Sequence, residues 1–203
     1  MATVLLGVTG SVAAIKTPEL VQLLLEAGHE VQVVTTHSAL YFFDPASLNT
    51  HRTVRLITDE DEWPGQDTGQ RYHRGQDVLH IELRRWAELF LVAPLDANTL
   101  AKFSHGICDN CLTSVWRAWD FQKPAILAPA MNTLMWDKPL THRQLQQLQA
   151  DATLEAGREE MLQIIPPIEK ELACGDTGTG AMAELPTIVA VCQQVLDKRI
   201  QEA

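Results

Sequence analysis

The 203-residue chain has the composition of a single globular domain, with 46% hydrophobic and 21% charged residues. Its formal net charge of −10 disfavours nucleic acid and anionic membrane surfaces as partners. The longest stretch without Asp, Glu, Lys or Arg covers residues 1–15 and contains glycines and hydroxyls, so the sequence predicts neither a membrane span nor a signal peptide. Four cysteines in a chain of this length do not make a disulfide framework. We therefore expect a soluble, reduced, cytoplasmic protein.

The first predicted elements form one βαβ unit. Residues 3–8 (TVLLGV) are a short apolar run that predicts a buried parallel strand. Ser11 then predicts the N-cap of a helix that continues to about residue 27, with Pro18 in its early part. Gly28 ends this helix, and residues 30–36 predict the second strand.

The same alternation continues along the chain. Further strands are predicted at residues 53–58, 89–94, 123–129 and 162–167, and further helices at residues 96–106, 109–119, 140–150 and 185–200. Polar residues 59–77 and glycine-rich residues 173–184 predict loops. This order predicts an α/β fold, a three-layer doubly wound parallel sheet in a single domain, residues 1–203.

The segment GVTGSVAAIK (7–16) joins the first strand to the first helix. A glycine turn at a helix N-terminus exposes N–H groups, and the helix dipole there favours a phosphate. The spacing is not the G-x-G-x-x-G of dinucleotide sites, and residues 35–37 offer no acid after the second strand. The segment favours a mononucleotide phosphate over NAD, with a plain turn as the alternative.

Two other polar positions allow both a structural and a functional interpretation. Asp96 and Thr99 follow a predicted strand, where ordinary helix capping explains them unless a second polar strand end faces the same crevice. His80 lies in an apolar–polar alternation just before a strand, where a lone histidine is more often structural than catalytic.

Two cysteine-containing segments and one acidic run also allow a structural interpretation. Cys174 lies among glycines in residues 172–184, which suits a lid with a reactive thiol or a flexible turn with an incidental one. The CDNC motif (108–111) lacks a second pair of zinc ligands, so we interpret it as packing. The acidic residues 59–62 are most simply a solvated face.

The stretch AILAPAMNTLMW (125–136) begins as a buried strand and contains Asn132 and Thr133 as its polar side chains. A buried amide without partners costs about 1–3 kcal/mol. The side-chain amide of Asn132 is therefore expected to have a hydrogen-bonding partner.

The segments GVTGSVAAIK, VLHIELRRWAELFLVAPLDANTLAK, GICDN, APAMNTLMW and ACGDTGTGAMAE occur in this order along the chain. Together they resemble the homo-oligomeric flavin-containing cysteine decarboxylases, from about residue 3 to about residue 196. The Pro-x-Met-Asn-x-x-Met-Trp block and the histidine motif are the specific parts of this resemblance. It implies a flavodoxin-like fold, FMN as cofactor, and a homotrimer with each active site at a subunit boundary. It also implies phosphopantothenoylcysteine as substrate, decarboxylated to phosphopantetheine in coenzyme A biosynthesis.

The resemblance implies roles for individual residues. FMN would be bound by Gly10, Ser11, Val12, Ala13, Thr35, His37, Phe42, Asp96, Ala97, Asn98, Thr99 and Ala130. The substrate would be bound by Asn132, which takes its carboxylate, with Met135 and Ala173 nearby. His80 and Cys174 would be catalytic, the cysteine as a late proton donor, and residues 173–184 would form a lid. No metal is implied.

Two positions depart from the family pattern. Glu171 stands near the lid cysteine where relatives often carry a basic residue, and Asp96 stands where some relatives carry Ser or Thr. Two alternatives stay open: a peptide cysteine decarboxylase, and an FMN-binding regulatory subunit of the phosphatase-inhibitor kind. A flavin prenyltransferase is disfavoured because it lacks the His and Pro-x-Met-Asn combination.

Overall fold

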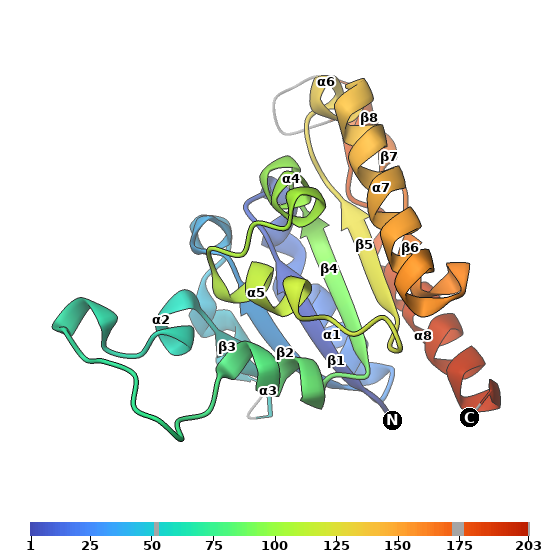
Figure 1. Ribbon diagram of the computed structural model, residues 1–203. Coiled ribbons are helices and arrows are strands. Elements are labelled where there is room, and N and C mark those ends of the chain that lie inside the picture. The colour runs from blue at the N-terminus through green and yellow to red at the C-terminus, as the bar shows by residue number, and fades with distance from the viewer. Residues whose placement is uncertain (51–52, 172–176, 203) are drawn as a thin grey trace.

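The computed structural model describes residues 1–50, 53–171 and 177–202, and its centre is a six-stranded parallel sheet (Figure 1). The strands run in the order β3-β2-β1-β4-β5-β6. Their bounds are β1 (Thr3–Val8), β2 (Glu30–Thr35), β3 (Arg55–Ile57), β4 (Leu89–Leu95), β5 (Ala125–Pro129) and β6 (Leu162–Ile164). A separate antiparallel hairpin consists of β7 (Ile168–Glu171) and β8 (Thr177–Ala181).

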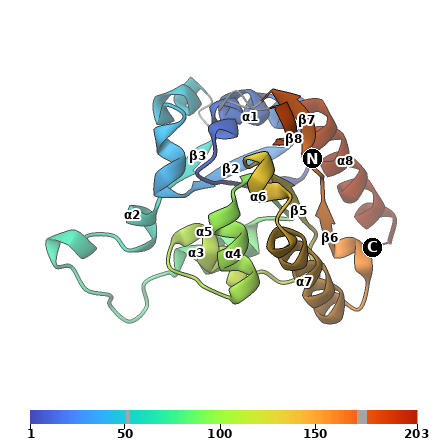
Figure 2. The same cartoon turned by 90° about the horizontal axis from the view of Figure 1, so that it is seen from above.

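Helices cover both faces of the sheet, which gives the three layers that the sequence predicts (Figure 2). One face carries α1 (Thr17–Glu26) and α8 (Leu185–Glu202); the other carries α3 (Leu79–Trp86), α4 (Ala97–His105), α5 (Cys111–Arg117) and α7 (Pro139–Ala156). The connections contain α2 (Asp59–Glu62), α6 (Thr133–Trp136) and the 3₁₀ helices η1 (Val12–Lys16), η2 (His37–Tyr41), η3 (Pro45–Thr50), η4 (Gln66–Thr68) and η5 (Glu159–Met161).

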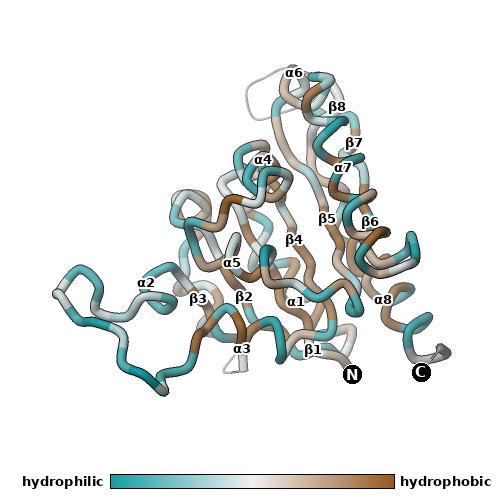
Figure 3. The backbone as a smooth tube through the Cα atoms, viewed as in Figure 1, coloured by the Kyte–Doolittle hydropathy of each residue, from teal (hydrophilic) through white to brown (hydrophobic). Residues whose placement is uncertain are grey.

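Alternate side chains of the central strands enter two apolar clusters, because successive residues of a strand point to opposite faces. Val4 and Leu6 pack with the residues of α1 and α8, whereas Leu5 packs with those of α3, α4, α5 and α7. Both faces are therefore buried, which explains why the strands read as continuous apolar runs. Figure 3 shows this contrast between the apolar sheet and the polar connection around α2.

The strand order indicates where a ligand would bind, beyond the ends of β1 and β4. The order is that of dinucleotide-binding folds, and it becomes the flavodoxin order when the three-residue edge strand β3 is left out. The succession of strands reverses direction between β1 and β4, which pair in parallel. In open α/β sheets, ligands bind beyond the carboxyl ends of the strands at such a reversal.

Helix α3 is held at its C-terminus by a lysine from the segment before β5. Lys123 Nζ donates to the carbonyl oxygens of Arg84 (2.9 Å), Arg85 (3.1 Å) and Ala87 (2.8 Å). Burial lowers the pKa of Lys123, with the positive charges of Arg199 and Arg84 as further causes. The ammonium group satisfies carbonyls that the end of a helix leaves without partners.

Three predictions about local structure were wrong. Residues 59–62 form α2 instead of a loop, because Thr58 and Asp61 make a capping box at its start. His80 lies in α3, where no helix was predicted. Residues 177–181, predicted as loop, form β8, whose backbone pairs with β7; residues 172–176 lie outside the described residues.

Two of the wider expectations concern cysteines and membranes. Asn110 caps α5 and Cys111 is buried, so packing explains this end of the CDNC motif, while Cys108 is exposed. The described residues contain no His, Cys, Asp and Glu group that could hold a metal ion. Among them, no helix has the length and apolar character needed to cross a bilayer.

Candidate functional site

A cavity of about 410 Å³ lies beyond the carboxyl ends of β1 and β5. Its volume is in the range of roughly 300–1,000 Å³ that small-molecule sites usually have. Mostly apolar side chains line it, with a few polar ones among them. The lining residues are Ser11, Val12, Ala13, Ile15, Lys16, Ala130, Met131, Asn132, Lys170, Glu171, Gly180, Ala181 and Met182. The cavity brings together predicted cofactor residues from two distant segments and the predicted substrate residue Asn132.

The glycine turn after β1 leads into η1, a 3₁₀ helix that precedes α1, whereas the sequence predicts one helix from Ser11 to about residue 27. Ser11 is the N-cap of this 3₁₀ helix, and its hydroxyl accepts the Ala13 N–H at 3.4 Å. The N–H groups of Ser11 and Ala14 also have partners, the carbonyl oxygens of Thr9 (2.8 Å) and Ser11 (2.9 Å), so the helix dipole is the main feature here that favours an anion. Val12 and Ile15 are 46% and 59% exposed, so apolar side chains flank the same turn.

Gly10 lies where three strand ends meet. A Cβ added there would lie 2.8 Å from Ser38 Cβ and 3.3 Å from Asp96 Oδ2, so only glycine fits. The Thr9 hydroxyl donates to the Pro94 carbonyl oxygen (2.8 Å) and accepts the Asp96 N–H (2.7 Å), which links the ends of β1 and β4. These bonds tie the ends of β1 and β4 together, but the residues predicted after β4, 96–99, do not line the 410 Å³ cavity.

Asp96 also has the structural role that the sequence suggests. Its Oδ1 accepts the Thr99 N–H at 2.7 Å, which makes it the N-cap of α4. Thr99 is buried at 1% exposure, Ala97 is half-buried and Asn98 is exposed. Helix capping therefore accounts for Asp96 in the single chain.

The predicted residues after β2 occupy different environments. Thr35 is fully buried, and its hydroxyl donates to the Thr36 carbonyl oxygen at 3.0 Å. His37 begins η2 and is exposed, while Phe42 ends η2 and is half-buried against the edge of Tyr41. These residues border the neighbouring strand end and do not line the 410 Å³ cavity.

Asn132 begins α6 and lines the cavity. Its side-chain oxygen accepts the Leu134 N–H at 2.9 Å, so the amide caps the helix and takes a defined orientation. The side chain is half-buried, which is less than the apolar context of its segment suggests. Met135 follows in the same helix and is 49% exposed.

Hairpin β7–β8 packs its glycines against the loop that carries Asn132. A Cβ at Gly180 would overlap the Met131 carbonyl oxygen, and one at Gly178 would lie 2.6 Å from Thr133 Oγ1. These glycines therefore allow close backbone contact, whereas the sequence suggested a flexible turn. Ala173 and Cys174, predicted in the same segment, lie outside the described residues.

A charged group at the cavity was missed by the sequence motifs. Glu184 lies 3.6 Å from Lys16 Nζ through Oε2, and it accepts a hydrogen bond from Lys170 Nζ through Oε1 at 3.2 Å. The hydrogen bond from Lys170 and the charge of Lys16 lower the pKa of Glu184. The three residues come from separate segments, so no local pattern could have predicted the group.

His80 lies in another part of the molecule, at the start of α3. Its Nδ1 is 2.6 Å from Glu62 Oε1, and its side chain is 24% exposed. Helices α3 and α6 lie apart in both views (Figures 1 and 2). A single chain therefore does not bring His80 and Asn132 together.

Comparisons with known proteins show the family to which the chain belongs. The flavoprotein family profile matches residues 1–197. The phosphopantothenoylcysteine decarboxylase of Mus musculus is 53% identical over 197 residues, which cover 96% of this chain and 87% of the mouse protein.

Two solved structures are similar over nearly the whole chain. One is a Cys-to-Ser mutant of PPC decarboxylase complexed with pantothenoylaminoethenethiol, with 46% identity, a TM-score of 0.83, and coverage of 97% of this chain and 98% of that one. The other is the FMN-binding protein AtHal3, with 46% identity, a TM-score of 0.81, and 97% coverage of both chains. With its crevice, its glycine turn and its asparagine loop, this chain belongs to the flavoprotein family, among the phosphopantothenoylcysteine decarboxylases, which are carboxy-lyases.

Proposed function

We propose that the protein decarboxylates phosphopantothenoylcysteine to phosphopantetheine with FMN as cofactor, a cytoplasmic step of coenzyme A biosynthesis. The observation that carries this proposal is the single cavity that joins Ser11–Ala13, Ala130 and Asn132. The names of the mouse relative and of the FMN-binding neighbour support the substrate and the cofactor. The whole chain, residues 1–203, would form the flavoprotein domain.

The cavity fits a flavin by the chemistry of its lining. The start of η1 at Ser11 is the positive end of a helix dipole, which favours a phosphate, and Val12, Ile15 and Met182 offer apolar contact for a flat ring. The chemistry that bound FMN supplies is reversible two-electron transfer: the substrate thiol is oxidised to a thioaldehyde, CO₂ leaves to give an enethiolate, and the electrons return to carbon.

Asn132 would bind the carboxylate that leaves as CO₂. A neutral amide holds this anion without a full opposing charge, whereas a lysine would stabilise the ground state against loss of CO₂. The cap on α6 supports the role, because the bond from Leu134 N–H fixes the amide before the substrate arrives. Met135, in the same short helix, would contact the substrate beside it.

His80 would take up the thiol or carboxylate proton of the substrate. Since one chain keeps His80 away from Asn132, the proposal joins them across a subunit boundary of a homotrimer. Exposed apolar side chains at and next to the cavity support a covered surface there. They are Val12 (46% exposed), Ile15 (59%), Leu134 (72%) and Met135 (49%).

Residues 173–184 would cover the substrate, with Ala173 in contact and Cys174 as donor of the final proton. The described end of this lid is already docked, through Gly180, on the loop that carries Asn132. The Cys-to-Ser relative complexed with an enethiol supports a late role for a cysteine, after loss of CO₂.

Two measurements test the proposal. Purified protein should absorb as a flavoprotein, and it should release CO₂ from phosphopantothenoylcysteine. Protein that is colourless and takes up no FMN would contradict the proposal and favour the regulatory alternative. CO₂ release from peptides ending in cysteine, without release from phosphopantothenoylcysteine, would favour the peptide decarboxylase.

A further inference from the structure

We propose that Glu62 is a positioning residue for His80: its carboxylate holds the proton on Nδ1 and leaves Nε2 as the nitrogen that accepts the substrate proton. The inference rests on the proposed function of His80. It assigns a catalytic purpose to one residue of an acidic run that the sequence suggested was only a solvated face.

Glu62 contacts His80 with both carboxylate oxygens. Oε1 lies 2.6 Å from the ring Nδ1, and Oε2 accepts the backbone N–H of His80 at 2.9 Å. An ionised carboxylate can only accept hydrogen bonds, so Nδ1 must carry the proton at this contact. In the neutral ring, Nε2 is then the acceptor. No described residue makes a hydrogen bond to Nε2, and the ring is partly exposed.

The helix that carries His80 favours a carboxylate at this place. Val78, at the N-cap of α3, makes no side-chain cap, so the His80 N–H would otherwise be one of the unpaired donors at the helix start. Glu62 serves as the cap from another segment. The positive end of the α3 dipole also stabilises the negative charge.

Glu62 is buried and its surroundings keep it in place. Its side chain is only 5% exposed. The Cys111 thiol lies 3.6 Å from Oε2, and burial, with the charge of Glu62 as the second cause, raises the pKa of this thiol far above its usual range. Cys111 therefore stays protonated and can donate weakly to the same oxygen.

Hydrogen bonds hold helix α2 in an orientation that brings Glu62, and not its acidic neighbours, to His80. At its start, the Thr58 N–H donates to Asp61 Oδ2 at 2.8 Å. The Cys111 N–H donates to Asp59 Oδ1 at 2.9 Å, which ties α2 to α5. Glu60, between these contacts, is exposed. A freely solvated acidic face would need neither anchor.

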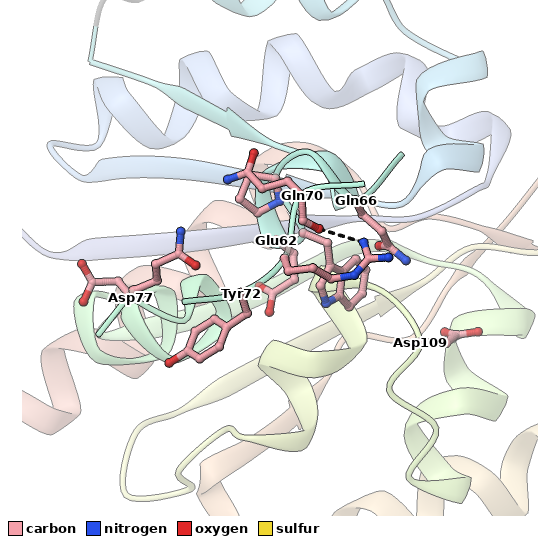
Figure 4. A pocket seen from close by; sticks show the side chains of 10 residues that line it. Glu62, Gln66, Gln70, Tyr72, Asp77 and Asp109 are labelled. Carbon is pink, nitrogen blue, oxygen red and sulfur yellow. Dashed lines mark hydrogen bonds between the residues drawn. The ribbon is translucent and has the colours of Figure 1, made fainter. Parts of the chain in front are cut away.

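Glu62, unlike His80, borders a hollow at the surface. Glu62 lies at a second cavity of about 890 Å³, where Figure 4 shows it together with Gln66, Gln70, Tyr72 and Asp109. The His80 ring is held at Nδ1 by a carboxylate side chain that is 5% exposed, while the His80 side chain itself is 24% exposed. In this arrangement the carboxylate orients the imidazole, and the imidazole exchanges the proton with the substrate.

The substitution Glu62→Gln tests the inference with little change in shape. If the amide oxygen keeps the backbone N–H of His80, the amide NH₂ faces Nδ1 and favours the tautomer with the proton on Nε2. We expect kcat to fall about 10²- to 10⁴-fold, with KM and FMN content unchanged. The matched control is Glu60→Gln, which removes one negative charge from the same helix without touching His80 and should keep the wild-type kcat.

The ring tautomer provides a readout that does not depend on turnover. Nitrogen-15 NMR of the His80 ring in the FMN-loaded protein should show the proton on Nδ1 in the wild type and on Nε2 in Glu62→Gln. A wild-type ring protonated on Nε2 would overturn the inference even if the variant fails to fold. So would a Glu62→Gln enzyme with the kcat of Glu60→Gln. If instead His80→Asn keeps full decarboxylation, the proposed function of His80 fails while the tautomer assignment stands.

Discussion

The backbone N–H of Met131 donates a 3.0 Å hydrogen bond to the carbonyl oxygen of Gly180. This bond joins hairpin β7–β8 to the loop that follows β5, although the two segments are far apart in the sequence. The contact is possible because position 180 has no side chain. Asn132, the next residue in the loop, is therefore positioned by the hairpin as well as by α6.

Replacing Gly180 by Ala should displace the hairpin. The new Cβ would overlap the Met131 carbonyl oxygen, a backbone atom that cannot turn away. We expect a loss of about 1–3 kcal/mol in the free energy of unfolding and a raised KM. Gly178→Ala is the comparison and should cost less, because its Cβ would meet side-chain atoms of Thr133 and no backbone atom. Denaturant titration that finds equal losses for the two variants would contradict this account.

Replacing Asn132 by Asp should abolish turnover while the protein stays yellow. Asp is as good an N-cap as Asn, so α6 should be retained. The second carboxylate would repel that of the substrate where the amide binds it, and we expect CO₂ release to fall at least about 10²-fold. Release of CO₂ near the wild-type rate, measured beside the flavin absorption, would remove Asn132 from the mechanism.

Mixing two inactive variants should restore activity if the site lies between subunits. His80→Asn should keep FMN but lose about 10²- to 10⁴-fold in CO₂ release. Its mixed assemblies with Asn132→Asp contain boundaries where intact His80 and intact Asn132 meet. We therefore expect partial recovery after unfolding and refolding the variants together. No recovery, with mixed assemblies verified by mass spectrometry, would contradict a site shared between subunits.

Replacing Cys174 by Ser should separate the two halves of the reaction. We expect CO₂ to be released but the oxidised enethiol to accumulate, because the late proton donor is missing. Mass spectrometry of the products measures the ratio of enethiol to phosphopantetheine. Normal product from this variant would show that the lid thiol is a bystander.

Buried His29 should make the protein less stable below about pH 6.5. Burial, helped by the positive charge of the N-terminus, lowers its pKa from 6.5, while Asp197 and Glu88 act in the opposite direction. The unfolded chain then binds more protons than the folded one in this range, so the free energy of unfolding decreases as the pH falls. The loss is about 1.4 kcal/mol for each unit by which the pKa is lowered.

A control variant isolates this contribution. His29→Gln cannot take up the proton, so its melting temperature should fall less between pH 7.5 and 5.5 than that of the wild type. Parallel curves for the two proteins would mean that another group causes the pH dependence.

The sheet and most helices could be predicted because their signals are local. The apolar run TVLLGV and the glycine after it define β1 and the turn at Ser11 with no knowledge of the rest of the chain. Asp96 could be recognised as a cap, and the crevice follows from the alternation of strands and helices alone.

The missed features depend on contacts between distant segments. Four acidic residues have no apolar periodicity, so α2 could not be predicted; it forms through its capping box and its bond to α5. The glycines of β8 are typical of a loop, and only the partner strand β7 turns them into a strand. The pairing of Glu62 with His80 joins two segments that no short motif links.

Side chains from other segments form hydrogen bonds with both ends of helix α3, Glu62 at its N-terminus and Lys123 at its C-terminus. The negative charge lies at the positive end of the helix dipole and the positive charge at its negative end, and both stabilise the helix. The eight-residue helix therefore does not depend on its intrinsic helix propensity alone. A designer who grafts the histidine motif onto another scaffold would have to transplant three separated pieces of chain, because the helix alone would arrive without its anchors.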